Sequence, residues 1–339
     1  MTEIMIDKIE IVAEISGNHN GSKNRLLDLV KMAKDSGASM VKVQCFRPET
    51  ITADSDHDWF QVNDGPWAGK SLFELYSMTY LPWEWYDDLF LLGKDLDLEI
   101  FASVFDEQSA DFISQYNSSR VKIASPEIID SKLIEHCADR FQEIIISTGM
   151  ASKIEVEDAA QIVRKSQKHL TLLQCVSEYP AQPGSYNLKG LRYLSSLADT
   201  IGISDHSIDD TVVLGSVALG AKFVEKHFID SRDSGGIDSH FSLEPNEFLS
   251  MANKIRDLEE ACAIEDYTEH NLDSGNRKYR RSLFFSSNLK KDHIVTSDDV
   301  KCIRPGLGLH PSNLDKVIGK KLNCKVNKNH PVKLQFLDL

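Results

Sequence analysis

Eight short apolar runs divide the first two-thirds of the chain, and nearly every run ends on a residue whose side chain can do chemistry. Polar or helix-periodic stretches separate the runs. Eight strands that alternate with helices predict an α/β fold, a (β/α)₈ TIM barrel. Because such barrels carry their active sites at the carboxyl ends of the strands, we expect the catalytic residues there. The runs span residues 9–15, 40–46, 99–105, 120–125, 143–149, 170–177, 200–206 and 223–229.

The composition is that of an ordinary globular protein. Apolar residues make up 41% of the chain, and no apolar stretch approaches the roughly 18 residues that a membrane-spanning helix needs. The N-terminus lacks the basic and apolar segments of a signal peptide. Six cysteines are widely scattered and form no CxxC pair. We therefore expect a reduced, cytoplasmic protein with no structural zinc and no membrane association.

The charge is unevenly distributed along the chain. The net charge is −14, yet residues 276–339 hold 14 Lys and Arg against 5 Asp and Glu. A basic tail beside an acidic body indicates that the two attract each other, within one chain or between chains. Because the tail's lysines are dispersed and no recognition motif accompanies them, we do not expect a nucleic-acid partner.

These patterns divide the chain into three segments. Residues 1–264 are predicted to form the barrel, and the polar stretch 265–279 reads as a linker. Residues 280–339 contain few long helical patterns and predict a small β-rich domain. Within it, residues 281–287 and 329–339 are predicted strands.

One insertion interrupts the regular alternation of strands and helices. Residues 47–98 are too long for a simple loop between a strand and its helix, and they contain all four tryptophans. The segment around Pro82 looks like two helical pieces. The aromatic residues either pack this excursion onto the barrel, or form a wall or lid over its mouth, or contribute to a dimer contact.

Two histidines end neighbouring predicted strands. His206 closes the seventh run and His227 lies in the eighth. Adjacent barrel strands bring their carboxyl ends together, so the two imidazoles could share a divalent metal, with Asp205 and Glu225 as further ligands or supporting groups. Two neutral histidines suit Mn²⁺, Fe²⁺, Zn²⁺ or Co²⁺ better than Mg²⁺ or Ca²⁺. The alternative is a pair of hydrogen-bonded core histidines.

Two lysines lie inside predicted strands. Lys42 and Lys122 have the side-chain parity of the barrel interior, where an unpaired ammonium is costly. Each therefore needs an anionic partner, either an internal carboxylate such as Glu14, Glu127 or Glu225, or an anionic substrate. A Schiff-base lysine is a third alternative, since burial lowers the pKa of lysine.

Hydroxyl groups accompany these lysines. Ser125, Ser147 and Ser204 lie at the ends of the fourth, fifth and seventh runs. Gly149 and Gly202 leave room for close backbone approach. Cations combined with several short donors are what a phosphate group requires, so the set predicts a phosphate-bearing ligand.

The motifs AEISGNHNGS, VKVQ, VKIASPE, STGM, CVSEYP, GISDHS and EKHF, in this order, closely resemble the sialic acid (nonulosonic acid) synthase family. The tail motifs RSLFFS, RPGLGLHP and VIGKK resemble the small antifreeze-like (SAF) domain of that family. The resemblance implies a transferase that condenses phosphoenolpyruvate (PEP) with an N-acetylated amino sugar to give a nine-carbon 2-keto sugar acid. WAGKSLFELY and LPWEW look most like the pseudaminic acid synthase branch; N-acetylneuraminate and legionaminate synthases are the alternatives.

The same resemblance implies roles for individual residues and for partners. It implies that His206 and His227 hold the metal, usually Mn²⁺, with Mg²⁺ and Co²⁺ as alternatives. It implies acidic reaction-centre residues at Glu14 and Glu127, beside the catalytic histidines. It implies a homodimer in which Arg304 of the swapped tail reaches the partner subunit's active site. PEP-binding residues would be Lys42, Ser103, Lys122, Ser125, Ser147 and Ser204, and sugar-binding residues would be Gln44, Tyr179, Asp238 and Arg304.

Two rival readings belong to other classes. A Schiff-base aldolase would use Lys42 or Lys122 and need no metal. A non-catalytic sugar- or ice-binding protein would have kept the fold and lost part of the ring of histidines and lysines, but every member of that ring is present.

Overall fold

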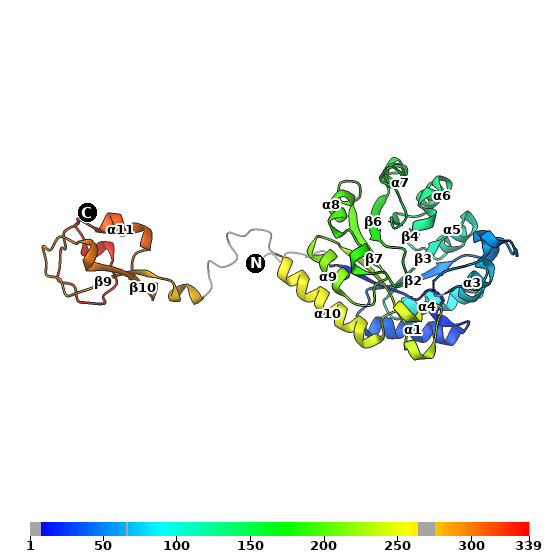
Figure 1. Cartoon of the computed structure of the whole chain (residues 1–339), viewed down its shortest axis with the longest axis horizontal. Coiled ribbons are helices and arrows are strands. Elements are labelled where there is room, and N and C mark those ends of the chain that lie inside the picture. Colours follow the sequence, from blue (N-terminus) through cyan, green and yellow to red (C-terminus); the bar gives the residue numbers. More distant parts are fainter. Residues whose placement is uncertain (1–7, 66, 264–274, 339) are drawn as a thin grey trace. The chain divides into compact units, whose positions relative to one another are not determined.

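The eight predicted strands form a closed parallel barrel (Figure 1). They are β1 (Glu10–Glu14), β2 (Met40–Cys45), β3 (Glu99–Val104), β4 (Arg120–Ile123), β5 (Glu143–Ser147), β6 (His169–Cys175), β7 (Thr200–Asp205) and β8 (Phe223–His227). Each lies within its predicted run, except that β6 begins one residue earlier. The strands pair in chain order, and β8 closes the barrel on β1. The TIM-barrel prediction is confirmed.

Figure 1 shows a computed structural model, which describes residues 8–65, 67–263 and 275–338. The chain divides into two compact units, Met1–Ala263 and Ile264–Leu339. Most of the linker predicted at 265–279 falls outside the described residues. Its last part, Gly275–Tyr279, is a 3₁₀ helix.

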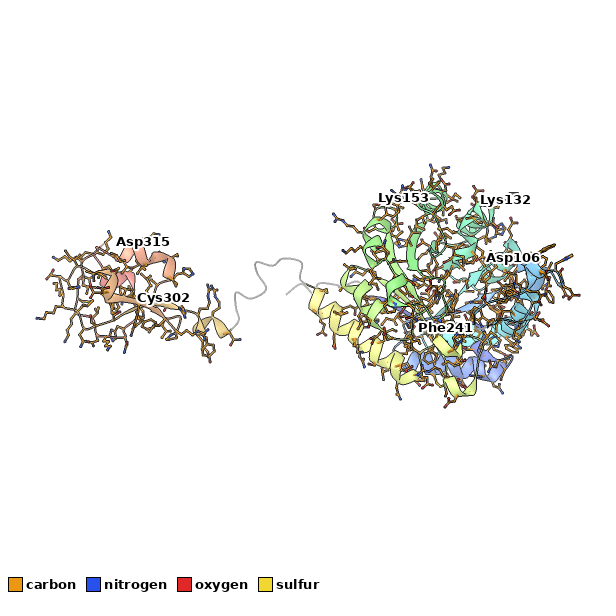
Figure 2. The ribbon with its side chains drawn as sticks, in the orientation of Figure 1. Asp106, Lys132, Lys153, Phe241, Cys302 and Asp315 are labelled. Atoms are coloured by element: carbon orange, nitrogen blue, oxygen red, sulfur yellow. The ribbon has the colours of Figure 1, made fainter. Side chains whose placement is uncertain are left out.

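Helices surround the barrel because their sequences place apolar residues on one face and cap their ends. Ser152 and Glu155 form a capping box at the start of α7, and Pro245 occupies the first turn of α10, where its missing N–H costs nothing. Figure 2 shows Lys132 and Lys153 at the outer rim. The helices after the strands are α1 (Lys23–Asp35), α4 (Tyr86–Asp95), α5 (Glu107–Ser114), α6 (Ser131–Arg140), α7 (Lys153–Lys165), α8 (Leu191–Leu194), α9 (Thr211–Ala218) and α10 (Pro245–Cys262).

The barrel interior has an apolar floor below a polar layer. The floor is made of Val12, Met40, Phe101, Ile145, Leu173 and Phe223. Because side chains alternate along a strand, the next inward positions toward the carboxyl ends share this parity, and they carry charged or polar groups. Gly202 allows this close packing, since a Cβ there would lie 2.3 Å from the carbonyl oxygen of Phe223.

The insertion after β2 contains α2 (Pro48–Ile51), α3 (Leu72–Thr79) and a 3₁₀ turn at Trp83–Trp85 that leads into α4. The two helical pieces around Pro82 are therefore confirmed. Trp83 stacks on Phe112 with ring centroids 4.2 Å apart. For this tryptophan, packing onto the barrel is the correct interpretation.

The second unit is small and built around one antiparallel pair of strands, β9 (Ser282–Phe285) and β10 (Val300–Ile303). One short helix, α11 (Leu314–Val317), accompanies them. The strand predicted at 329–339 is wrong, because residues 329–338, the described part of this segment, contain a 3₁₀ helix at Leu334–Phe336 and only isolated bridges. In the described parts of both units, we find no helix with the length and apolar character needed to cross a bilayer.

Candidate active site

A cavity of about 290 Å³ opens at the carboxyl ends of the strands. This is the end that the barrel fold predicts for a catalytic site. Most of the residues predicted from the sequence meet here, although they come from seven different strands or the loops that follow them. The predicted residues that line it are Lys42, Gln44, Ser103, Lys122, Ser125, Ser147, Tyr179, Ser204, His206, His227 and Asp238.

Four charged side chains form a cluster here: Lys42, Lys122 and Glu225 line the cavity, and Glu14 lies beside them. Lys42 forms an ion pair with Glu14 and lies 3.7 Å from Glu225. Lys122 donates to Glu225 at 2.5 Å. All four side chains are at most 4% exposed. The internal ion pairs considered from the sequence are therefore present, with Glu14 and Glu225 as the partners and without Glu127.

Burial and pairing pull the pKa values of this cluster in opposite directions. Burial disfavours the charged form of Lys42, but Glu14 and Glu225 outweigh it and raise the pKa of Lys42. Burial would likewise raise the pKa of Glu225, but Lys122 and Lys42 lower it to about 2. Pairing thus favours the charged forms of Lys42 and Glu225, whereas for Lys122 burial outweighs the attraction of Glu225 and lowers the pKa of its ammonium group.

Hydroxyl groups surround these cations. Ser204 donates to Glu225 at 3.0 Å and lies 3.5 Å from Lys122. Ser125 accepts a hydrogen bond from the backbone N–H of Gly149 at 3.0 Å. The buried hydroxyl of Ser147 has no hydrogen-bond partner among the described residues. Such an unpaired donor beside two ammonium groups matches the chemistry of an anionic ligand.

The rings of His206 and His227 lie with centroids 5.3 Å apart, as their neighbouring strands predicted. His206 Nδ1 contacts the carbonyl oxygen of Val176 at 2.7 Å. A carbonyl only accepts, so a neutral ring carries its proton on Nδ1 and presents the lone pair of Nε2. His227 Nδ1 is buried, lies 3.5 Å from Asp238 and has no hydrogen-bond partner among the described residues. Both rings therefore fit a divalent metal.

Further protein ligands do not gather around this pair. Across residues 8–65, 67–263 and 275–338, no group of three or more His, Cys, Asp and Glu side chains is arranged to hold a metal ion. Asp205, considered as a ligand from the sequence, is committed elsewhere: it pairs with the buried Lys226. A metal held by the two histidines would keep several positions for water and substrate oxygens.

Two predicted acidic residues lie beside the cavity and do not line it. Glu14 is fully buried and held by Lys42 and Ser16. Glu127 follows β4 in a 3₁₀ helix. One of its carboxylate oxygens is buried without a partner among the described residues, and burial raises the pKa of Glu127 to about 7. A carboxyl group that titrates near neutral pH suits proton transfer.

The insertion supplies one wall of the cavity. Its residues Trp67, Leu75, Tyr76 and Thr79 line the cavity, and the first three are apolar or aromatic. Trp67 donates its indole N–H to the carbonyl of Ile237 at 3.0 Å. For Trp67, the wall considered from the sequence is therefore the correct interpretation.

Cys175 was not predicted as a site residue, yet it lines the cavity beside His206. Burial would raise the pKa of its thiol, but the imidazole of His206 lowers it below the ordinary value. The parity of β6 could have indicated this position, since Cys175 and Leu173 share the inward face.

Arg304 belongs to the second unit, where it precedes Pro305 at the end of β10. The two units are described separately, so its role at an active site stays a prediction.

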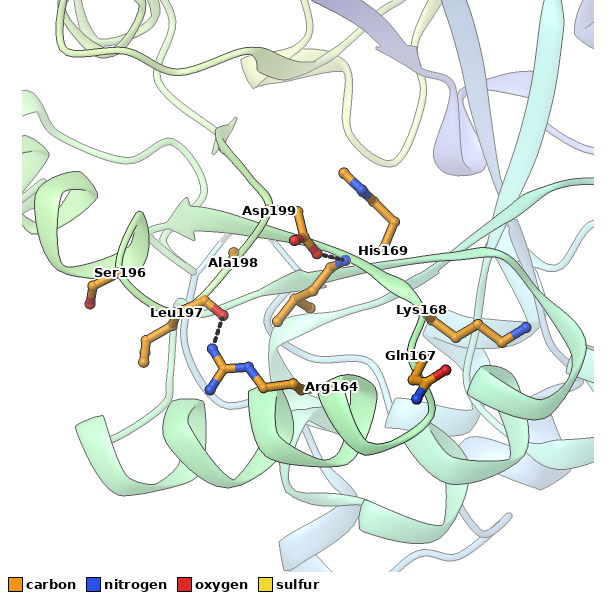
Figure 3. Close-up of a pocket in the computed structure, with 9 residues that line it drawn as sticks. Arg164, Gln167, Lys168, His169, Ser196, Leu197, Ala198 and Asp199 are labelled. Carbon is orange, nitrogen blue, oxygen red and sulfur yellow. Dashed lines mark hydrogen bonds between the residues drawn. The ribbon is translucent and has the colours of Figure 1, made fainter.

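A second hollow, of about 450 Å³, lies at the opposite, amino-terminal ends of β6 and β7 (Figure 3). Its polar groups serve the backbone: Arg164 donates to the carbonyl of Leu197 at 3.2 Å, and Asp199 accepts from the N–H of Leu170 at 2.9 Å. Figure 3 shows Lys168 directed away from these groups. We therefore interpret this hollow as structural, because its polar side chains stabilise the backbone at this end of the barrel.

Comparison with known proteins agrees with the geometry. Residues 29–266 match the model of the NeuB family, and residues 280–338 match the SAF domain. The chain belongs to the NeuB family. The resemblance inferred from the motifs is confirmed.

Individual relatives extend this result. A pseudaminic acid synthase of Helicobacter pylori is 35% identical over 331 residues, which cover 97% of each chain. An N,N'-diacetyllegionaminic acid synthase of Legionella pneumophila is 32% identical, over 94% of this chain and 91% of the relative. The crystal structure of an N-acetylneuraminic acid synthetase from Leptospira borgpetersenii matches with a TM-score of 0.70 at 28% identity, covering 77% of this chain and 87% of that one.

Proposed function

We propose that this chain is a transferase that condenses PEP with an N-acetylated amino sugar, giving a nonulosonic acid and phosphate, with pseudaminic acid as the product. The observation that carries the proposal is one cavity that combines two buried lysines, several serine hydroxyls and two adjacent histidines. Of these hydroxyls, that of Ser147 has no hydrogen-bond partner in the described part of the chain. The lysines and hydroxyls suit an anion that carries a phosphate group. A metal held by the two histidines would suit a carbonyl compound bound beside that anion. Family membership and the pseudaminic acid synthase relatives support the same reaction.

In the proposed reaction, C3 of PEP forms a bond to the aldehyde carbon of the open-chain sugar. Water adds at C2 of the PEP unit, and phosphate leaves by cleavage of the C–O bond. Lys42 and Lys122 would offset the charges of the PEP carboxylate and phosphate. Their low exposure strengthens this effect, since charges interact more strongly away from water.

His206 and His227 would hold the divalent metal, which we expect to be Mn²⁺. When bound, such an ion acts as a Lewis acid toward a carbonyl oxygen. Among the chain's own groups, Asp238 lies near His227 and is placed to orient its ring. Val176 fixes the ring of His206 in the same way through its carbonyl.

Proton transfer would fall to Glu127, with Glu14 in a supporting role. The pKa of Glu127, raised to about 7, lets this group both hold and release a proton near neutral pH. Glu14 is tied to Lys42 in a buried ion pair and would instead fix the lysine in place.

The apolar wall favours the pseudaminic and legionaminic acid branches over the N-acetylneuraminate branch. The sugar precursors of pseudaminic and legionaminic acids are 6-deoxy sugars, whose methyl group gains from apolar surroundings such as Trp67, Leu75 and Tyr76. Gln44, Tyr179 and Asp238 would supply polar contacts to the sugar.

We also propose a cytoplasmic homodimer in which Arg304 completes the partner subunit's site. The six free cysteines support the cytoplasmic location.

The experiment that tests the metal role compares His206→Ala with wild type in a PEP-dependent phosphate release assay. We expect the variant to fold and to lose turnover. Full activity of metal-stripped variant protein would contradict the role.

A Schiff-base aldolase is the second candidate, because burial lowers the pKa of Lys122 even though Glu225 opposes it. Borohydride reduction in the presence of pyruvate distinguishes the two functions. A covalent adduct on Lys122 and activity that is insensitive to chelators would favour the aldolase.

A further inference from the structure

A buried polar network lies on the outer side of β7 and β8, away from the cavity. The side chains of Lys226 and Asp205 are both 0% exposed and form an ion pair at 2.5 Å. Ser207 donates its backbone N–H to Asp205 Oδ1 at 2.9 Å and its hydroxyl to Oδ2 at 2.9 Å. None of these three residues lines the cavity, so the proposed chemistry gives the network no direct use.

Tyr186 connects this network to the site. Its hydroxyl donates to Asp205 Oδ1 at 2.6 Å and accepts the backbone N–H of His206 at 3.0 Å. The carboxylate polarises the hydroxyl and makes its oxygen a better acceptor, so the two hydrogen bonds strengthen each other. Through this hydroxyl, the fully buried Lys226–Asp205 ion pair is connected to the backbone of His206, which lines the cavity.

The segment that carries Tyr186 makes three hydrogen bonds to His206. Besides the tyrosine hydroxyl, the carbonyl of Val176 contacts Nδ1 at 2.7 Å, and Ala181 donates its N–H to the carbonyl of His206 at 3.0 Å. The backbone N–H, the backbone C=O and one ring nitrogen are thus all fixed by residues 176–186. Of the two ring nitrogens, Nε2 is the one that this segment does not bond, and the thiol of Cys175 lies beside the ring.

We propose that Tyr186 is a positioning residue that orients His206 for metal binding, with the Lys226–Asp205 pair as its anchor. The inference rests on the metal role proposed for His206. Without the hydroxyl, the N–H of His206 loses its acceptor, and this segment then holds the residue by two hydrogen bonds instead of three, those of Val176 and Ala181. The ring then samples more orientations, and metal affinity falls because each binding event must restore the productive one.

The test compares Tyr186→Phe with Tyr193→Phe in the full chain. Tyr193 is a matched control, since its hydroxyl also donates to a carboxylate at 2.6 Å, that of Glu157 on the barrel exterior. Mn²⁺ affinity is measured by titration with electron paramagnetic resonance, beginning with wild type. We expect Tyr186→Phe to bind Mn²⁺ about tenfold more weakly and Tyr193→Phe to bind it like wild type.

Measurements of activity and of stability distinguish a positioning role of Tyr186 from a purely structural one. Activity of Tyr186→Phe should recover toward wild type as Mn²⁺ is raised to saturation, because only the affinity is impaired. Equal Mn²⁺ affinity in both variants, with reduced stability of Tyr186→Phe, would overturn the inference while leaving the proposed function intact. Absence of Mn²⁺ binding by wild type would overturn the metal site, and this inference with it.

Discussion

Glu127 should make the barrel less stable as the pH rises, and Glu127→Gln should remove that effect. Burial raises the pKa of Glu127 from 4.5 to about 7. Below pH 4.5 the carboxyl group is protonated in both the folded and unfolded states. Between the two values the unfolded chain releases the proton and the folded chain keeps it, so stability falls with pH. Above pH 7 the loss is complete, at roughly 3 kcal/mol.

The amide of Gln has the shape of the protonated acid but does not ionise. We therefore expect the stability of Glu127→Gln, relative to wild type, to increase by roughly 2.5 kcal/mol between pH 5 and pH 8. The exposed Glu135 on α6 provides the control, because Glu135→Gln makes the same chemical change at the surface.

Urea unfolding followed by tryptophan fluorescence suits this measurement. All four tryptophans lie between residues 59 and 85, so the signal reports on the barrel unit alone. If Glu127→Gln and wild type kept the same stability difference at both pH values, the carboxyl group would titrate normally and the reasoning from its burial would be refuted.

Three further changes test other parts of the account. Gly202→Ala places a Cβ 2.3 Å from the carbonyl of Phe223 and should cost about 3 kcal/mol in urea unfolding; Gly184→Ala, with no atom within 4 Å, should cost nothing, and equal stabilities would contradict the packing argument. Glu225→Gln should cost about 3–5 kcal/mol by the same method, since it leaves a buried ammonium without its carboxylate; a neutral effect would mean that another group takes over the pairing. Arg304→Ala should raise KM for the sugar, and a change in KM for PEP alone would contradict its proposed place.

The barrel could be predicted because its signal is local and repeated. Each apolar run needed only its own residues to predict a strand, and the alternation with helices allowed one fold class. The pairing of His206 with His227 followed directly, because β7 and β8 are neighbours in any such barrel. The same reasoning failed for the segment predicted at 329–339: in its described part, residues 329–338, Val332 and Leu337 reach the core of the second unit, and the backbone forms a 3₁₀ helix and isolated bridges.

The rest of the site depends on contacts between distant segments. Trp67 reaches the cavity because its indole binds the carbonyl of Ile237, far along the chain. Tyr186 meets Asp205 through a loop with no regular pattern. The sequence left two roles open for Glu225, that of a metal ligand or supporting group and that of a partner for the lysines, and it could not decide between them. The distance of 2.5 Å between Lys122 Nζ and the Glu225 carboxylate identifies Glu225 as a partner for the lysines.

The central claim is a metal-dependent condensation of PEP with a 6-deoxy amino sugar. The most direct measurement is phosphate release from PEP in the presence of Mn²⁺, with N-acetylmannosamine and the 6-deoxy diacetamido precursors of legionaminic and pseudaminic acids offered in parallel, each with and without EDTA. The account predicts release that EDTA abolishes and that is fastest with the precursor of pseudaminic acid. Phosphate release with none of the three sugars, or release that EDTA leaves unchanged, would contradict it.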